Sequence, residues 1–299
     1  MRKAIFKGLL ASMFFAATFV LNRSMNLGGG NYLWSACLRY IFMLPILYIL
    51  LMKNKGANKV HSKIKEDKMG WFLWSTVGFG LFYLPLSYAS NSGEAWLVVG
   101  TWQITIIAGA LLTPLWGKKI PYKMIFVSIT IIVGVFILQL EGAKGSQAVS
   151  PLSCILPVLV AAFCYPLGNR KMMDVSKGEL STTQRVYGMT LCSMPFWIIV
   201  AVFAYIQVGL PSVGQVLQAL AVAIFSGVVA TILFFRATDM VKDNPRQLAA
   251  VEATQAGEVV FTLIGGLLFL GEKLPGPVGI FGLFLILSGM MINSFVLEK

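Results

Sequence analysis

The chain has 299 residues, of which 57% are apolar and 12% charged, with a formal net charge of +12. Soluble domains carry about 45–50% apolar and about 25% charged residues, so this composition excludes a disordered chain, a disulfide scaffold and a soluble enzyme. The basic excess suggests nucleic acid as a partner only if the basic residues cluster.

Apolar stretches follow one another from end to end, and each is close to the 20 or so residues that cross a bilayer as a helix. Ten lie near residues 4–23, 31–52, 69–90, 94–116, 122–140, 151–169, 183–206, 215–236, 247–270 and 277–297. The runs are continuous rather than alternating, which favours helices over a β-barrel. The first follows Met1-Arg2-Lys3 without a cleavage site, so we interpret it as a retained helix. We expect an all-α polytopic membrane protein with no soluble domain.

The basic residues indicate the orientation of these spans. With the N-terminus in the cytoplasm, 19 of the 24 basic residues fall on the cytoplasmic side and three outside. This asymmetry predicts that both termini are cytoplasmic. Six lysines lie in the longest loop, 53–68, which could contact anionic lipid but is better explained as an orientation determinant. Because the basic residues are spread over loops on one membrane face, nucleic acid is not an expected partner.

The second half of the chain resembles the first. Three motifs recur in order, offset by 146 to 154 residues: Asn22-Arg23-Ser24-Met25 with Asn169-Arg170-Lys171-Met172, Arg39-Tyr40 and Met43 with Arg185, Tyr187 and Met189, and Gly117-Lys118-Lys119-Ile120-Pro121 with Gly271-Glu272-Lys273-Leu274-Pro275. Each half, 1–145 and 146–299, then holds five spans. Since five is odd, the halves are inverted in the membrane. Inverted repeats are typical of secondary transporters, with the substrate near the midplane between them. The alternative is a duplication without transport, as in some channels and membrane enzymes.

Charged residues inside spans are candidate site residues, because burying a charge in lipid is costly. The stretch 247–270 holds Glu252, Gln255 and Glu258, and Glu258 lies about 18 Å from the cytoplasmic end at 1.5 Å per residue. A carboxyl group at that depth could exchange a proton with substrate, as in proton-coupled antiporters. The three side chains are about one helical turn apart, so they form one polar ribbon. Interhelical hydrogen bonding is the structural alternative.

Arg39 lies about 12 Å into the second span and needs a partner. Glu94 and the acids at 252 and 258 are candidates, and an anionic or zwitterionic substrate is another. Other arginines, including Arg23 and Arg185, lie near span ends, where we expect them to be interfacial anchors.

Aromatic and amide side chains suggest a pocket lining in the fourth span. Gln103 matches Gln255 in the repeat, Trp102 precedes it and Tyr88 is nearby. Such a lining would suit an organic cation through cation–π contact.

Catalytic and metal chemistry find little support. His61 is the single histidine, and the four cysteines form no C-x-x-C pair. We expect no metal, no cofactor and no enzymatic activity.

The span number, the inverted halves and the segments LNRSM (21–25), LRYIFMLP (38–45) and NPRQLAAVEATQ (244–255) resemble the drug/metabolite transporter superfamily, and within it a bacterial branch called putative multidrug resistance efflux transporters. The resemblance covers essentially the whole chain. It implies secondary transport, often proton-coupled export of drugs, amino acids or other metabolites. The small multidrug-resistance proteins use a glutamate in their first helix, whereas the first span here has only Ser12 and Thr18 as polar midspan residues.

The sequence therefore predicts a secondary exporter of a small organic solute in a bacterial inner membrane, driven by protons through Glu258 or Glu252. One chain holds both halves, so a monomer suffices, and a homodimer remains open. An uptake permease or facilitator is the alternative within transport. A lipid-processing membrane protein or a channel is the alternative of another class.

Overall fold

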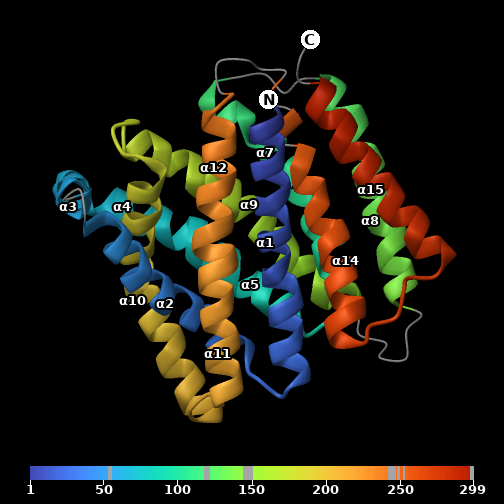
Figure 1. Cartoon of the computed structure of the whole chain (residues 1–299), viewed down its shortest axis with the longest axis horizontal. Helices are drawn as coiled ribbons and strands as arrows, with labels where there is room; N and C mark the ends of the chain where they lie inside the picture. The colour runs from blue at the N-terminus through green and yellow to red at the C-terminus, as the bar shows by residue number, and fades with distance from the viewer. Residues whose placement is uncertain are drawn as a thin grey trace.

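The computed structural model describes residues 1–52, 56–117, 122–143, 151–241, 247, 250–251 and 253–296, with the backbone alone for 122–127, 151, 235, 239 and 293–296. Every regular element in these residues is a helix (Figure 1). In chain order they are α1 (Arg2–Leu27), α2 (Tyr32–Met52), α3 (Gly56–Glu66), α4 (Lys68–Ser75), η1 (Thr76–Gly80), α5 (Leu81–Ala89), α6 (Ala95–Trp102), α7 (Ile104–Leu111), η2 (Thr113–Trp116), α8 (Tyr122–Gly142), α9 (Pro151–Val175), α10 (Thr182–Val208), α11 (Val213–Val222), η3 (Ala223–Ala230), α12 (Thr231–Asp239), η4 (Ala253–Gln255), α14 (Ala256–Leu270) and α15 (Pro277–Val296).

The predicted class, an all-α polytopic membrane protein, agrees with these helices. Eight helical stretches of the described residues are long and apolar enough to cross a membrane. Shorter apolar helices, Ser128–Gly142 and Pro277–Ile292, occupy the fifth and tenth predicted positions. The total of ten spans therefore stays a prediction.

The outer surface of the bundle is apolar. Ile206, Leu268 and Phe269 are 72%, 72% and 78% exposed, and many other large apolar side chains face outward with them. A water-soluble monomer rarely exposes apolar surface on this scale. Lipid is the solvent that accommodates such a surface, in agreement with the high apolar content of the chain.

Several spans are interrupted by other helix types. The third span contains the π-helix η1 between α4 and α5, and the eighth contains the π-helix η3 between α11 and α12. The fourth breaks at Gln103, between α6 and α7, and the ninth opens with the 3-10 helix η4, which ends at Gln255. Such irregular turns are common at functional sites, and each of these interruptions lies beside the cavity described below.

The segment 53–68 is not simply a loop, as its lysines had suggested, because residues 56–66 form helix α3. Ala57, Val60 and Ile64 recur at helical spacing, and Val60 is fully buried. Gly188 of α10 leaves the room for this contact, because a Cβ there would come within 2.9 Å of Val60. Amphipathic packing on the bundle thus overrides the polar composition of the segment.

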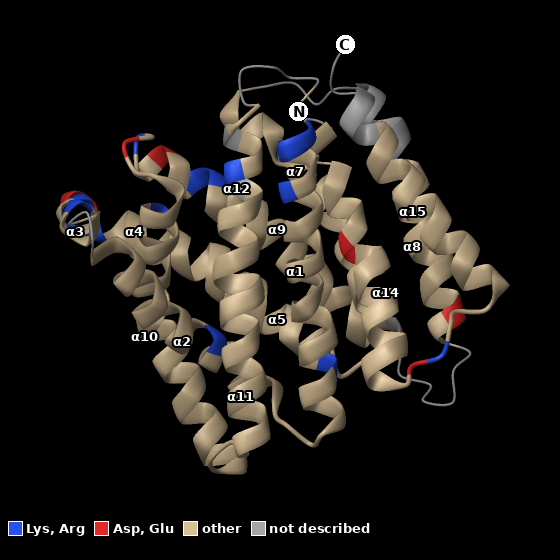
Figure 2. Ribbon diagram, viewed as in Figure 1, with Lys and Arg blue, Asp and Glu red and all other residues tan. Residues whose placement is uncertain are grey.

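Contacts between spans come in matching pairs. Helix α1 packs on η3 and α12, while α9 packs on η1 and α5; α1 also packs on α14, while α9 packs on α6 and α7. Helix α2 packs on α10, where the Tyr40 and Trp197 rings stack at 4.5 Å, and α8 packs on α15. The start of α1 and the end of α15 lie at the same end of the bundle (Figure 1). Figure 2 shows that most basic residues also gather there.

Candidate functional site

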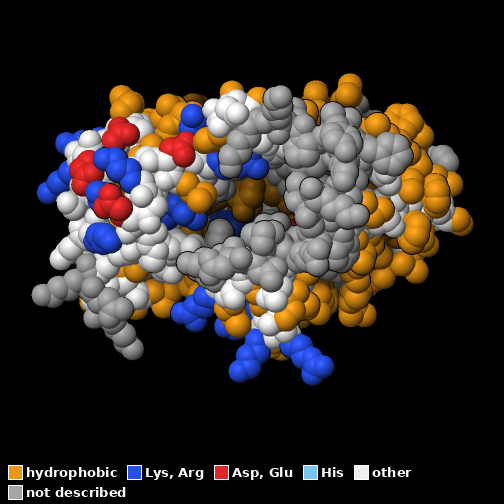
Figure 3. All heavy atoms as spheres, turned by 90° about the horizontal axis from the view of Figure 1, so that it is seen from above, with side chains coloured by type: hydrophobic (Ala, Val, Ile, Leu, Met, Phe, Trp, Pro, Cys, Tyr) orange, Lys and Arg blue, Asp and Glu red, His pale blue; other side chains and the backbone are white. Residues whose placement is uncertain are grey.

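The interior of the bundle encloses a cavity of about 350 Å³. Its volume lies at the lower end of the range of about 300–1,000 Å³ that is typical of small-molecule sites. Viewed from the end at which α1 begins, the described surface is hollowed at its centre, with apolar and basic side chains in the depression (Figure 3). The cavity is therefore reached from that end.

Both polar and aromatic side chains line the cavity, and they come from both halves of the chain. The charged and amide side chains are Arg39, Gln103, Asn169, Arg185, Gln255 and Glu258. The aromatic ones are Phe15, Phe19, Tyr40, Phe79, Phe82, Trp102, Tyr165 and Phe234.

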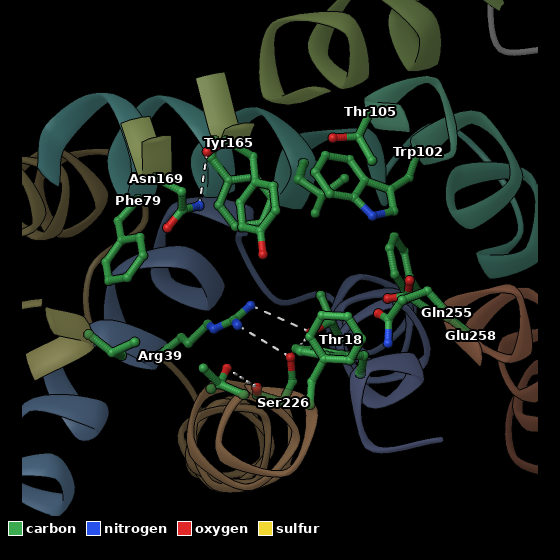
Figure 4. Close-up of a pocket in the computed structure, with 18 of the residues that line it drawn as sticks. Thr18, Arg39, Phe79, Trp102, Thr105, Tyr165, Asn169, Ser226, Gln255 and Glu258 are labelled. Carbon is green, nitrogen blue, oxygen red and sulfur yellow. Dashed lines mark hydrogen bonds between the residues drawn. The ribbon is translucent and has the colours of Figure 1, made fainter. Parts of the chain in front are cut away.

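Arg39 is buried in α2 and is held without a carboxylate. Its Nη1 and Nη2 donate to the Thr18 and Ser226 hydroxyls at 3.5 and 3.2 Å, and these two hydroxyls bond each other at 2.5 Å (Figure 4). The guanidinium also lies 4.1 Å from the centroid of the Tyr83 ring. Among the described residues no carboxylate lies within ion-pair distance of Arg39, and its Nε has no hydrogen-bond partner. The positive charge is thus oriented but not neutralised.

The hydroxyls that hold Arg39 come from two different spans. Thr18 lies on α1, and Ser226 lies within the π-helix η3. The wider π turn shifts the side chains of one helix face, which is one reason that π segments accompany functional sites. Thr231 anchors the end of this segment by donating to the Ser226 carbonyl at 3.3 Å.

Aromatic rings form the wall between Arg39 and Glu258. Trp102 lies 5.3 Å from Phe82 and 5.7 Å from Tyr165, and Phe82 lies 4.8 Å from Tyr165, measured between ring centroids. Asn169 donates to the Tyr165 carbonyl at 2.9 Å, one turn earlier in α9. Contacting aromatic rings form a stiff apolar surface, because each ring restricts the rotation of the next.

Glu258 lies on the opposite side of the cavity from Arg39, beside Gln255 (Figure 4). It is 7% exposed and belongs to the first turn of α14, where the helix dipole favours a negative charge. Within the described residues Glu258 forms no hydrogen bond or ion pair that would neutralise it, and the Gln255 Nε2 is buried without a partner. These groups are available to a ligand or a proton.

Of the predicted site residues, the structure brings Arg39, Trp102, Gln103, Gln255 and Glu258 to one cavity. Gln103 donates to the Val99 carbonyl at 3.0 Å and so closes the end of α6. Tyr88 does not line the cavity. Its ring is 39% exposed and packs edge-on against Tyr32 at 5.0 Å. Glu252 lies outside the described residues.

Glu94 was wrong as an expected partner of Arg39, and Arg23 was wrong as an expected interfacial anchor. Glu94 precedes α6 at the far end of the bundle and forms no ion pair with Arg39. Arg185 lies in the first turn of α10, near a span end as expected, and it also lines the cavity. Arg23 is only 7% exposed and bonded within the protein, so it does not extend to a membrane surface.

The end of the bundle opposite the mouth is sealed. Arg23 Nε lies 3.5 Å from Glu272 Oε1, which also accepts from the Ala95 backbone N–H at 2.9 Å. Arg23 Nη1 donates to the Ser90 carbonyl at 3.3 Å, and Asn26 donates to Asn91 at 2.5 Å. This network joins α1 to the chain after α5, the start of α6 and the turn after α14.

Between the cavity and the sealed end the space is too small for a solute. A void of about 10 Å³ there shares Phe19 and Leu86 with the cavity. That volume is near the minimum for one water molecule. Phe19 and Leu86 thus lie between the cavity and this small void.

Within the described residues no group of three or more His, Cys, Asp or Glu side chains is placed to hold a metal ion.

Residues that the sequence reading missed are Thr18 as a site residue, Ser226, Tyr165 and Asn169. Hydroxyl and aromatic side chains cost little in a span, so Thr18, Ser226 and Tyr165 did not stand out. Asn169 was noted only as part of the repeated Asn-Arg motif. One available signal was that Thr18 is, with Ser12, one of two polar midspan residues in the first span.

Residues 2–299 match the protein family described as "Putative multidrug resistance efflux transporter". The chain is 46% identical over 306 residues to the "Uncharacterized protein YjlA" of Bacillus subtilis (strain 168), an alignment that covers 98% of this chain and 94% of that protein. It is 44% identical over 278 residues to the "Uncharacterized 42.1 kDa protein in intracellular alkaline protease 3'region" of Shouchella clausii, covering 89% and 73% of the two chains.

Proposed function

The chain belongs to the putative multidrug resistance efflux transporter family, and from this premise we propose that it exports a small organic solute by proton-coupled alternating access. The observation that carries the proposal is a solute-sized cavity that is open at one end and sealed at the other, with buried charges inside. A transporter of this kind must hold its substrate near the middle of the membrane with access from one side at a time.

The inverted repeat, 1–145 and 146–299, is part of the proposal. It is supported by the paired contacts α1 with η3 and α12 against α9 with η1 and α5. It is also supported by the two π-helices, at 76–80 and 223–230, and by left-handed glycines at Gly117 and Gly271 after matching spans. In this arrangement one half rocks against the other around the cavity.

We assign the open end to the cytoplasm of a bacterium, so that the protein is a multi-pass inner-membrane protein facing inward. The gathering of basic residues at that end supports this, because cytoplasmic loops are rich in lysine and arginine. The Arg23–Glu272 network is then the outer gate, which must open for export. A monomer provides every lining residue named above.

Glu258 is the proposed coupling acid. Its carboxyl group lies in the cavity without a neutralising partner among the described residues, so substrate and proton can compete for it. Substrate binds the ionised form from the cytoplasm. After the outer gate opens, a proton from outside replaces the substrate and returns with the carboxyl group. Glu252 is the second candidate for this role.

Reconstitution tests the proposal. The full chain is placed in liposomes, a pH gradient is imposed, and flux is measured for a panel of labelled amino acids, nucleosides and cationic dyes. We expect gradient-driven accumulation of one class that falls to the level of empty liposomes in Glu258→Gln. Glu66→Gln, at an exposed carboxylate, is the matched control.

Other outcomes identify the alternatives. Full gradient-driven flux in both Glu258→Gln and Glu252→Gln contradicts the coupling role. Counterflow that needs no gradient indicates a facilitator. Absence of flux for every class contradicts the transport proposal.

A further inference from the structure

Two opposite buried charges share one cavity but do not neutralise each other. Arg39 and Glu258 are each 7% exposed, and both line the cavity. No ion pair joins them, and Arg39 is held by hydroxyls and an aromatic ring instead. Isolated charges at this depth are costly. A ligand with complementary charges would remove that cost.

The direction of each group is consistent with an occupant between them. In Figure 4 the Arg39 guanidinium extends into the cavity from one side, while Glu258 and Gln255 face it from the other. The rings of Trp102 and Tyr165 lie along the space between. The unpartnered Arg39 Nε and Gln255 Nε2 add hydrogen-bond capacity at the two ends.

We propose that the transported solute is a small zwitterion with an apolar or aromatic body, whose anionic group binds Arg39 and whose cationic group binds Glu258. This deepens the proposed function and rests on it. A guanidinium donates in a planar fork that suits carboxylates and related anions. The rings accept the apolar body, which lowers the cost of removing it from water.

A singly charged solute fits this cavity less well. An organic cation would satisfy Glu258 but leave Arg39 uncompensated, with Arg185 also lining the same cavity. An anion would satisfy Arg39 and leave Glu258 uncompensated. Each mismatch leaves one of these two buried charges without a counter-charge among the described residues, which binding sites reject strongly.

A matched ligand series tests the proposal on the full chain in lipid nanodiscs, by titration calorimetry. The series is L-tryptophan, tryptamine, which lacks the carboxylate, and indole-3-propionate, which lacks the ammonium. Leucine, isoamylamine and 4-methylpentanoate repeat it on an aliphatic body, and empty nanodiscs correct for partition into lipid. We expect the zwitterion of at least one series to bind at least about tenfold more tightly than either analogue, the effect of one charge-assisted contact.

Variants then assign each end. In Arg39→Gln, we expect the zwitterion to bind no more tightly than the amine that lacks the carboxylate. In Glu258→Gln, we expect it to bind no more tightly than the acid that lacks the ammonium group. Tyr88→Phe, outside the cavity, should leave both preferences unchanged. If Arg39→Gln does not fold, the order of the ligands on the unmodified chain still decides.

If the amine or the acid binds more tightly than the zwitterion of its series, the proposal of a zwitterionic solute is wrong. Absence of binding in both series also contradicts it. These results leave the proposed function intact if a pH gradient still drives flux of another solute. Loss of all gradient-driven flux overturns the proposed function itself.

Discussion

Two buried arginine–glutamate combinations of the described residues can be compared, and one of them is an ion pair. At the sealed end, Arg23 and Glu272 lie 3.5 Å apart, with the Ala95 N–H completing the network. In the cavity, Arg39 and Glu258 are each as buried as Arg23. Arg39 bonds to hydroxyls, and Glu258 forms no hydrogen bond or ion pair with the described residues. A paired arginine closes a path, whereas an unpaired one can attract a solute.

The two clusters are connected through space. Arg39 lies over the Tyr83 ring, and the Tyr83 hydroxyl bonds the Asn22 side chain at 3.1 Å, next to Arg23 on α1. A change at Arg39 can therefore reach the gate through contacting groups. This is a spatial relation, and coupling along it is measurable by double-mutant cycles.

The largest effect is expected from breaking the pair at the sealed end. Glu272→Gln keeps a similar shape but removes the counter-charge of the buried Arg23. Because burial also opposes ionisation of Glu272, we expect a loss of about 1.5–3 kcal/mol in the free energy of unfolding, the value of a hydrogen bond to a charged group. Equilibrium unfolding in detergent measures the loss, and flux without a gradient measures the leak. Lys273→Gln, the adjacent residue, is the control. If Glu272→Gln loses no more free energy of unfolding than Lys273→Gln, the Arg23–Glu272 pair does not stabilise the sealed end.

The next effect comes from making a pair in the cavity. Ser226→Asp places a carboxylate beside Arg39, so the cavity would resemble the sealed end. We expect affinity for the zwitterion to fall by about tenfold to a hundredfold, or roughly 1.4–2.8 kcal/mol. Calorimetric titration measures it. Ser226→Ala loses only a hydroxyl contact and should keep most of the affinity. Equal losses in the two variants would show that the counter-charge is irrelevant.

Removing both charges at the sealed end should cost less than removing one. Arg23→Met with Glu272→Gln leaves no buried charge, so we expect most of the stability lost in Glu272→Gln to return. The double-mutant cycle should give a coupling of about 1 kcal/mol or more. Additive losses would mean that the two side chains do not interact.

The smallest effect is a pH dependence. Burial raises the pKa of Glu272, in the turn between α14 and α15, against the opposing effects of the Ala95 N–H and Arg23. The folded chain therefore holds this proton more tightly than the unfolded chain. The contribution of Glu272 to stability is fully present below its unfolded pKa and declines as pH rises through the raised folded pKa.

Glu179 has the opposite sign, because the hydrogen bond and charge of Lys63 lower its pKa. Its contribution is present above its unfolded pKa and lost as pH falls through the lowered folded pKa. As pH rises across the acidic range, Glu272 lowers the unfolding midpoint and Glu179 raises it. Glu272→Gln should therefore shift the slope of midpoint against pH in the positive direction, and Glu179→Gln should shift it in the negative direction. An unchanged slope in Glu272→Gln would contradict the assignment.

The sequence was informative where a residue was costly in its context. Apolar runs located the eight helical stretches that are long enough to cross a membrane, and Arg39 and Glu258 were noted as candidates because charges in lipid are rare. Hydropathy could not show that Thr18 and Ser226, 208 positions apart, hold the same guanidinium. Arg23 was misjudged because its distance from a span end says nothing about Glu272, which the fold brings to it.

Composition misled in the segment 56–66 as well. Its lysines hid the spacing of Ala57, Val60 and Ile64, so helix α3 was not predicted. Tyr88 was grouped with Trp102 by proximity in sequence. Tyr88 instead lies in the last turn of α5, where its ring packs against Tyr32 outside the cavity.

Helices α8 and α15 approach at glycines. A Cβ at Gly134 would come within 2.8 Å of the Gly282 carbonyl oxygen, and a Cβ at Gly282 within 2.9 Å of the Gly134 oxygen. The two glycines thus allow the backbones of α8 and α15 to approach closely. If the two halves rotate against each other as proposed, α8 and α15 would form the pivot of that rigid-body rotation. A small rotation at the contact between α8 and α15 would then produce a larger displacement at the Arg23–Glu272 network.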